Sequence, residues 1–203
     1  MFIYPKTYRK LRRGPQVILP KDIGIIIAYS GISKESVCVD AGTGSGWLAL
    51  SLARLCKRVI SYDLRHDFLS IANKNKEILG LDNITFKEGD VFKKIDERGV
   101  DLVTLDLPNP EKALKNVKKA LRPDGCVVSY LPNMEQVKTY VEKLERLRFE
   151  DAYTVEVIVR DILVRKEGTR PSTKGIWHTG YLTFARAPQV ISREMQKPNA
   201  PNS

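Results

Sequence analysis

The stretch from residue 37 to residue 46 reads Val-Cys-Val-Asp-Ala-Gly-Thr-Gly-Ser-Gly, and it decides the fold of this 203-residue chain. Its first three residues form a short apolar run, which indicates a buried strand, and residues 47–55 have the pattern of a helix. The glycines between them let backbone N–H groups approach a ligand that a Cβ would keep away. Open α/β sheets bind ligands at this end of their strands. The stretch therefore predicts a ligand-binding turn between the first parallel strand and its helix.

Apolar strands and amphipathic helices alternate through the rest of the chain. Strands are predicted at 58–62, 84–86, 100–105 and 126–131, and helices at 66–79, after Asn109 and after Asn133. Such alternation implies parallel pairing with right-handed crossovers. Two further β-type runs, 153–164 and 177–185, have no helix between them and should pair antiparallel at one edge. We expect a doubly wound α/β domain with a mostly parallel, seven-stranded sheet and an antiparallel edge strand.

Two asparagines are predicted to begin helices. Asn109 followed by Pro110 indicates an N-cap with proline at the first helical position, and the helix should bury side chains as far as Leu121. Asn133, with Gln136 three residues later, resembles a capping box. In both cases the asparagine oxygen would accept a hydrogen bond from a backbone N–H of the first turn.

The spacing of the three glycines selects the ligand. A dinucleotide-binding turn needs its third glycine where this chain has Trp47, and a P-loop needs a lysine that does not follow here. The order acidic-x-Gly-x-Gly-x-Gly resembles the turn of class I methyltransferases, and this resemblance implies S-adenosylmethionine as cofactor. The turn residues that it implies as cofactor-binding are Gly42, Thr43, Gly44, Ser45 and Gly46.

Two carboxylates stand at the ends of the next two strands. Asp63 ends the second strand, where it can accept hydrogen bonds from both ribose hydroxyls, and Leu64 beside it is a further candidate contact. Asp90 ends the third strand with Val91 beside it, and it is placed to accept from the exocyclic amine of the cofactor's adenine. A helix N-cap for Asp63 and a turn residue for Asp90 are the alternatives. Three elements in register along successive strands favour the cofactor site.

The segment 105–110, Leu-Asp-Leu-Pro-Asn-Pro, follows the fourth strand and enters the same crevice. In methyltransferases of this fold, that loop faces the transferred methyl group. We therefore predict Asp106 as the catalytic residue, with Leu107 and Pro108 as substrate contacts. A helix-capping aspartate is the alternative, but Asn109 already fills the predicted capping place.

The Asp-Leu-Pro-x-Pro order resembles the TrmI-type tRNA adenine-N1 methyltransferases. Similar family segments are found at 12–22 (Arg-Arg-x-x-Gln-Val-Ile-x-Pro-Lys-Asp), 129–133 (Ser-Tyr-Leu-Pro-Asn), 169–171 (Thr-Arg-Pro) and 178–184 (His-Thr-Gly-Tyr-Leu-Thr-Phe). The similarity covers roughly residues 12–186, which is nearly the whole domain. Arg170 and His178 lie in these late segments and are candidate substrate-binding residues, Arg170 as a phosphate contact and His178 more in a structural than a catalytic role.

The resemblance implies methylation of N1 of an adenine in the T loop of tRNA, at position 58 with its neighbour 57 as a second candidate. N1 carries an in-plane lone pair and can attack a sulfonium methyl without prior deprotonation. The product is cationic, so a carboxylate near the exocyclic amine would stabilise the developing charge. Asp106 could supply it. The adenine must first be extruded from the folded tRNA.

The charge of the chain is consistent with a polyanionic partner. The sequence has 34 Lys+Arg against 24 Asp+Glu, a formal net charge of +10, and such an excess favours nucleic acid because bound phosphates release counterions. Basic residues cluster before the first apolar segment, where Tyr4 and Tyr8 interleave with them as stacking groups would. A second basic cluster follows at 160–174.

Other features bound the class of protein. We divide the chain into a basic arm (1–22), a methyltransferase domain (23–187) and a tail expected to be disordered (188–203). No apolar run reaches membrane-span length and residues 1–14 lack a secretory signal, so we expect a cytoplasmic protein without membrane contact. The spacing of Cys38, Cys56 and Cys126 fits neither a zinc site nor a disulfide framework, which predicts buried reduced thiols and no metal.

The chain departs from the family pattern in three places. The tyrosine expected before Pro-Lys-Asp is Leu19, the tryptophan expected after Asp-Leu-Pro-x-Pro is Glu111, and a short basic arm stands where relatives carry a small N-terminal β-domain. Relatives assemble as tetramers, which implies a homo-oligomer here, with a tetramer favoured. A small-molecule methyltransferase of the corrinoid-precursor type and a non-catalytic tRNA-binding subunit are the alternatives. The intact glycine turn disfavours the second.

Overall fold

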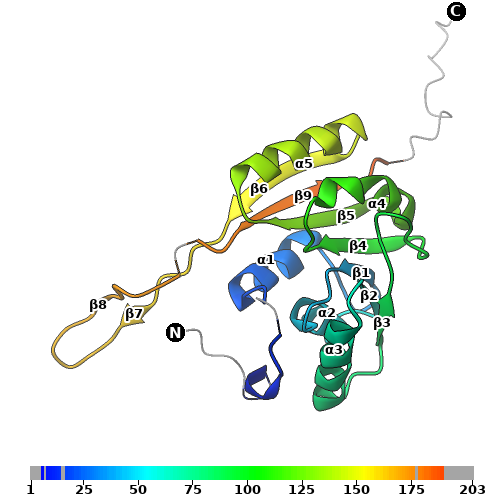
Figure 1. Ribbon diagram of the computed structural model, residues 1–203. Helices are drawn as coiled ribbons and strands as arrows, with labels where there is room; N and C mark the ends of the chain where they lie inside the picture. Colours follow the sequence, from blue (N-terminus) through cyan, green and yellow to red (C-terminus); the bar gives the residue numbers. More distant parts are fainter. Residues whose placement is uncertain (1–5, 7, 15–16, 177, 190–203) are drawn as a thin grey trace, which may run out of the picture.

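The structure is a computed structural model that describes residues 6, 8–14, 17–176 and 178–189 (Figure 1). Its main sheet has seven strands in the order β3-β2-β1-β4-β5-β9-β6, and β7 pairs with β8 in a separate hairpin. The strands are β1 (Val37–Ala41), β2 (Arg58–Asp63), β3 (Ile84–Glu88), β4 (Val100–Leu105), β5 (Leu121–Leu131), β6 (Glu150–Glu156), β7 (Ile162–Leu163), β8 (Arg170–Pro171) and β9 (Tyr181–Arg186). The β7–β8 hairpin projects away from the domain (Figure 1).

Helices cover both faces of the sheet. The helices are α1 (Pro20–Ser30), α2 (Trp47–Ala53), α3 (His66–Leu79), α4 (Leu114–Ala120) and α5 (Met134–Arg146), with short 3₁₀ turns η1 (Tyr8–Lys10) and η2 (Pro110–Lys112). One apolar core joins the sheet to α1 and α2, and includes Ile26, Leu50 and Leu52. A second core on the other face joins it to α4 and α5. This sandwich confirms the doubly wound α/β prediction.

The parallel part of the sheet matches the sequence pattern closely. The five strands from β3 to β5 pair in parallel, and each βα junction places its loop at the same edge. β9 runs antiparallel to both β5 and β6, so the expected antiparallel strand lies at this end of the sheet, one strand in from the edge. The predicted cap of α5 is also confirmed, because the Asn133 side chain accepts a hydrogen bond from the Gln136 N–H at 2.9 Å.

The predicted cap at Asn109 is confirmed in position, with Pro110 opening the next turn, but wrong in its side-chain contact. Asn109 has a left-handed backbone (φ 54°) and its side chain caps nothing, because the segment after it turns as η2 before α4 begins at Leu114. Leu121, expected within that helix, is instead the first residue of β5. The strand is lengthened by a bulge, since Val100 pairs with Leu121 whereas Leu102 pairs with Cys126.

Other boundaries also differ from the sequence patterns. The run 153–164 divides into β6 and β7, and the run 177–185 forms β9 only from Tyr181 onward, with its first residue outside the described residues. α1 was not predicted, and the boundary drawn between residues 22 and 23 falls inside it. Tyr4 and residues 190–203 of the tail also lie outside the described residues.

Candidate active site

The glycine turn between β1 and α2 is built from left-handed backbone. Gly42, Gly44 and Gly46 have φ values of 93°, 51° and 82°, which other residues rarely adopt. Space is limiting as well, because a Cβ on Gly42 would lie 2.1 Å from the carbonyl oxygen of Asp106. The Asp106 N–H in turn donates to the Ala41 carbonyl at 2.9 Å. Close contact between the turn and the loop after β4 therefore requires glycine at position 42.

Asp40 forms a buried polar floor beneath this turn. Its two carboxylate oxygens accept hydrogen bonds from the hydroxyls of Ser61 on β2 and Thr104 on β4, both at 2.6 Å. Thr43 donates to Ser61 at 2.6 Å, which joins the turn to the same network. Burial raises the pKa of the Asp40 carboxyl, and the two hydroxyls partly oppose that shift. Sequence reasoning used this residue only as the acidic position of the motif and missed its role in joining three strands.

Asp63 braces the glycine turn. One of its oxygens accepts the Gly44 N–H and the other the Arg65 N–H, both at 3.0 Å. The N-cap position of α3 is Arg65, so the alternative role of Asp63 as that cap was wrong. Asp90 lines the cavity and accepts the Phe92 N–H at 2.9 Å, an Asx-type turn contact, while its second oxygen lies 3.9 Å from the Lys93 ammonium.

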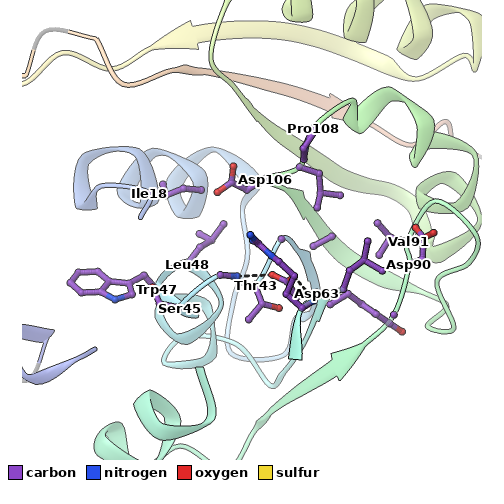
Figure 2. A pocket seen from close by; sticks show the side chains of 18 of the residues that line it. Ile18, Thr43, Ser45, Trp47, Leu48, Asp63, Asp90, Val91, Asp106 and Pro108 are labelled. Atoms are coloured by element: carbon purple, nitrogen blue, oxygen red, sulfur yellow. Dashed lines mark hydrogen bonds and ion pairs between the residues drawn. The ribbon is translucent and has the colours of Figure 1, made fainter. Parts of the chain in front are cut away.

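A cavity of about 450 Å³ lies over the turn (Figure 2), within the size range of small-molecule sites. Its lining includes, from the predicted site residues, Gly42, Thr43, Gly44, Ser45, Asp63, Leu64, Asp90, Val91, Asp106, Leu107 and Pro108. Gly46 is adjacent in the chain but absent from the lining, because it faces Ala72 and Leu50 instead. The structure thus brings eleven of the predicted residues around one space.

Several features of the cavity fit a nucleoside ligand with a charged tail. The Ser45 hydroxyl is buried and has no hydrogen-bond partner within the described part of the chain. A Cβ on Gly89 would lie 3.0 Å from the Tyr62 ring, so the cavity floor depends on a small residue there as well. The walls contributed by Ile18, Trp47 and Leu48 are apolar. Polar groups at the turn and apolar walls around them suit S-adenosylmethionine.

Asp106 is the most perturbed carboxyl of the cavity. Burial raises its pKa to about 7, and the negative charge of Asp40 contributes to the same shift. Within the described residues its carboxylate makes no hydrogen bond, and Figure 2 shows it pointing into the space between Ile18 and Pro108. A desolvated acceptor in the lining of a cofactor-sized cavity, without a hydrogen-bond partner among the described residues, is a candidate catalytic group.

Comparison with known proteins identifies the family. Residues 8–170 match the family described as tRNA methyltransferase complex GCD14 subunit. The chain belongs to this family. A curated relative, the tRNA (adenine(57)-N(1)/adenine(58)-N(1))-methyltransferase TrmI of Methanocaldococcus jannaschii, is 42% identical over 220 residues, which cover 93% of this chain and 78% of the relative.

Two solved structures support the same assignment. The tRNA (m1A58) methyltransferase TrmI of Aquifex aeolicus superposes with a TM-score of 0.81 at 29% identity, covering 87% of this chain and 72% of that one. A S-adenosylmethionine-dependent O-methyltransferase of Thermotoga maritima gives a TM-score of 0.83 at 29% identity, covering 86% and 68%. This family member is therefore an S-adenosylmethionine-dependent methyltransferase with the class I fold.

The structure places two predicted substrate residues of this methyltransferase outside the cavity. Arg170 is exposed on β8, where it lines a separate hollow of about 570 Å³ with Arg165 and Lys174. His178 lies before β9, with Nδ1 2.6 Å from the Glu156 carboxylate and Nε2 3.1 Å from a backbone carbonyl. The contact with Glu156 and then that carbonyl raise the pKa of His178.

Sequence reasoning missed a buried ion pair beside the cavity. Lys21 donates to the Asp22 carboxylate and to the Thr179 hydroxyl, both at 2.7 Å, and Thr179 donates to Asp22 at 3.2 Å. Tyr130 donates to the Thr179 carbonyl from β5. The start of α1 is thereby tied to the loop that carries His178. Lys21 and Asp22 belong to the Pro-Lys-Asp segment of the family pattern, but the pattern alone did not predict their contact with Thr179.

Two features are absent from the described residues. None of the helices in the described part of the chain is long and apolar enough to cross a membrane. Among the same residues, no group of three or more histidine, cysteine or acidic side chains could hold a metal ion.

Proposed function

We propose that this methyltransferase transfers a methyl group from S-adenosylmethionine to N1 of an adenine in the T loop of tRNA, at position 58 with position 57 as a second target. The observation that carries the proposal is Asp106, a desolvated carboxyl in the lining of the cofactor cavity without a hydrogen-bond partner in the described residues. Membership in the GCD14 family and 42% identity to an archaeal TrmI support the substrate.

We assign the cofactor contacts to the first three βα junctions. Bound S-adenosylmethionine supplies an electrophilic methyl group on a sulfonium. The glycine turn would present backbone N–H groups to its amino-acid end, and Asp63 would accept from the ribose hydroxyls while still bracing Gly44. Asp90 would accept from the adenine amine. Leu64, 62% exposed at the cavity rim, would contact the adenine ring together with Val91.

The chemistry requires no base to remove a proton from N1, because its lone pair is free to attack. Asp106 would accept a hydrogen bond from the exocyclic amine of the target adenine. That contact holds N1 in line with the methyl group and stabilises positive charge as it develops on the ring. Ile18 and Leu107, which line the cavity near Asp106, would exclude water and strengthen this interaction.

Recognition of tRNA would use positive charge outside the cavity. The target adenine must leave its stacked position to enter a space of this size. Arg170 on the projecting hairpin is exposed and suited to a phosphate contact. His178, held between β5 and β6, would position the loop at the mouth of the site instead of reacting.

We also propose a homo-oligomer, with a tetramer favoured. The segment around the β7–β8 hairpin exposes large apolar side chains, including Ile158, Ile162 and Val164. Monomers seldom leave such side chains clustered in solvent. Sedimentation velocity at micromolar concentration should give an assembly, and a monomer would contradict this part of the proposal. Because tRNA is the substrate, we place the enzyme in the cytoplasm.

Methyl transfer from labelled S-adenosylmethionine to an unmodified tRNA transcript tests the function. Mass spectrometry of the digested product should find N1-methyladenosine. A transcript with guanine at both positions should lose that product, and transcripts with guanine at 58 alone or at 57 alone separate the two targets. Cofactor binding without transfer to any transcript would overturn the proposed substrate and favour the small-molecule alternative.

A further inference from the structure

Two of the three cysteines meet in the core near the start of β1, at the other end of the strand from the cofactor turn. Cys38 lies within β1 and is fully buried, and Cys56 lies between α2 and β2 with 6% of its surface exposed. Their Sγ atoms are 3.3 Å apart. A disulfide requires about 2.05 Å between the sulfurs, so the two Sγ atoms must come closer by about 1.2 Å.

The backbone around the pair is well held. The Cys56 N–H donates to the Leu52 carbonyl at 3.0 Å, and the Cys56 carbonyl accepts from the Asn83 side chain at 2.8 Å. The next residue, Lys57, donates its N–H to the Ser36 carbonyl at 2.9 Å. These bonds fix the end of α2 against the start of β1. The two thiols therefore face each other because of the fold and not by chance contact of mobile loops.

We propose that Cys38 and Cys56 are a site of reversible disulfide formation, oxidised by a peroxide. The Cys56 thiolate attacks one oxygen of hydrogen peroxide and becomes a sulfenic acid, with hydroxide leaving. The Cys38 sulfur then attacks the Cys56 sulfur, and the sulfenic oxygen leaves as water. In sum, two thiols and one peroxide become one disulfide and two waters, so the peroxide takes up both electrons and both protons.

The order of the steps follows from the surroundings of each sulfur. The hydrogen bond from Cys38 lowers the pKa of the Cys56 thiol, whereas that same bond and burial raise the pKa of Cys38. Cys56 is also the more exposed of the two. Cys56 is therefore the attacking thiolate and Cys38 the resolving thiol.

The third cysteine provides an internal control. Cys126 lies in β5, in the same row of the sheet as Cys38, with Leu102 of β4 between them. Two strand spacings separate the backbones by about 9–10 Å, too far for a disulfide. Cys126 is as buried as Cys38. Any general effect of oxidant on buried thiols should affect it equally.

The consequence concerns the cofactor turn. A bond between Cys38 and Cys56 closes a loop that contains the whole of Gly42 to Gly46 and α2. Closing a loop of this length restricts the unfolded chain and raises stability. Oxidation would thus stabilise the turn without a new contact to any ligand.

The test treats the folded full-length chain with hydrogen peroxide, blocks remaining thiols with N-ethylmaleimide in denaturant, and measures mass. After the mass of the single maleimide on Cys126 is subtracted, a loss of 2 Da is expected, and dithiothreitol added before the blocking step should reverse it. Trypsin cuts after Lys34, Arg54 and Lys57, so the disulfide should join peptide 35–54 to peptide 55–57. The melting temperature of the oxidised chain should rise by on the order of 5–10 °C.

Matched variants complete the experiment. Cys126→Ala should still lose 2 Da, and Cys56→Ala should not. Gains of 16 or 32 Da on Cys56 without a link to Cys38 would overturn the proposal, as would three thiols that remain unmodified in the folded chain. A 2 Da loss that persists in Cys56→Ala would do the same. None of these readouts depends on tRNA methylation.

Discussion

The two sides of the active-site cavity are constructed differently. On the cofactor side, the glycine turn, Asp63 and Asp90 come from three consecutive βα junctions, and the backbone of each junction is hydrogen-bonded within it or to its neighbour. On the substrate side, Ile18 and Asp106 come from segments far apart in the chain. The cofactor side thus depends on local backbone geometry, and the substrate side on long-range contacts. Substitutions on one side should therefore change cofactor binding, and substitutions on the other side should change methyl transfer.

The largest effect is expected where the two sides meet. Gly42→Ala would place a Cβ 2.1 Å from the Asp106 carbonyl oxygen and strain a backbone at φ 93°. The unfolding free energy should fall by more than about 3 kcal/mol, with loss of cofactor binding and transfer. Gly24→Ala is the matched control, because nothing lies within 4 Å of its Cβ in the interior of α1. The free energy of unfolding of Gly24→Ala, measured by chemical denaturation, should rise by about 0.5–1 kcal/mol.

Asp106→Ala should damage the substrate side alone. The variant removes the carboxylate that would stabilise the transition state, so kcat/KM for tRNA should fall roughly 10²–10³-fold. The dissociation constant for S-adenosylmethionine, measured by calorimetry, should change by less than about threefold, since a change of that size is under 1 kcal/mol. Undiminished turnover would remove Asp106 from the mechanism.

Asp63→Asn should damage the cofactor side alone. The amide keeps one acceptor oxygen but presents an NH₂ group to a donor, either the Gly44 N–H or the Arg65 N–H. Cofactor affinity should weaken by about 10–100-fold, which corresponds to one or two mismatched hydrogen bonds. At saturating cofactor, kcat should recover most of its value. A kcat loss equal to that of Asp106→Ala would contradict the separation of roles.

The pH profile should report on Asp106. Its pKa is raised to about 7, so the carboxyl becomes protonated below that pH and can no longer act as a charged acceptor. Accordingly, kcat/KM should fall about tenfold per pH unit below 7 and level off above it. Burial disfavours the ionised carboxyl, so Asp106 destabilises the folded wild type at pH 8. The free energy of unfolding of Asp106→Asn should therefore exceed that of the wild type at pH 8 by about 1–3 kcal/mol. That difference should vanish near pH 4.

The smallest effect is expected farthest from the cavity. Arg170→Ala should weaken tRNA binding by a few fold and reduce the slope of log affinity against log salt by about 1, as loss of one phosphate contact would. Cofactor affinity should stay unchanged. The control is Arg146→Ala, because Arg146 is an exposed arginine of α5. This variant should leave the slope of log affinity against log salt unchanged. Equal slopes in both variants would place the tRNA elsewhere.

Sequence patterns predicted the strands, turn and helices around the glycine-turn side of the cavity almost completely. The strand, glycine turn and helix around Gly42 to Gly46 appear where periodicity put them, and α3 and β4 begin and end at the predicted residues. Parallel strands place their carboxyl ends at one edge, so the positions of Asp63 and Asp90 followed from the fold class alone. Elsewhere the patterns failed at Asn109 and Leu121, where a left-handed residue and a bulge in β5 replaced the expected cap contact and helix, and they did not predict α1.

The sequence by itself determined the doubly wound fold, the cofactor turn and the family, because these depend on hydrophobic period and on glycines whose backbone angles are local properties. Only the tertiary structure decided the pKa of Asp106, the floor formed by Asp40, and the contact of Lys21 with Thr179. Each of these depends on desolvation or on hydrogen bonds between segments distant in the chain. Local sequence does not specify which distant segments come into contact, so these interactions could be identified only in the folded structure.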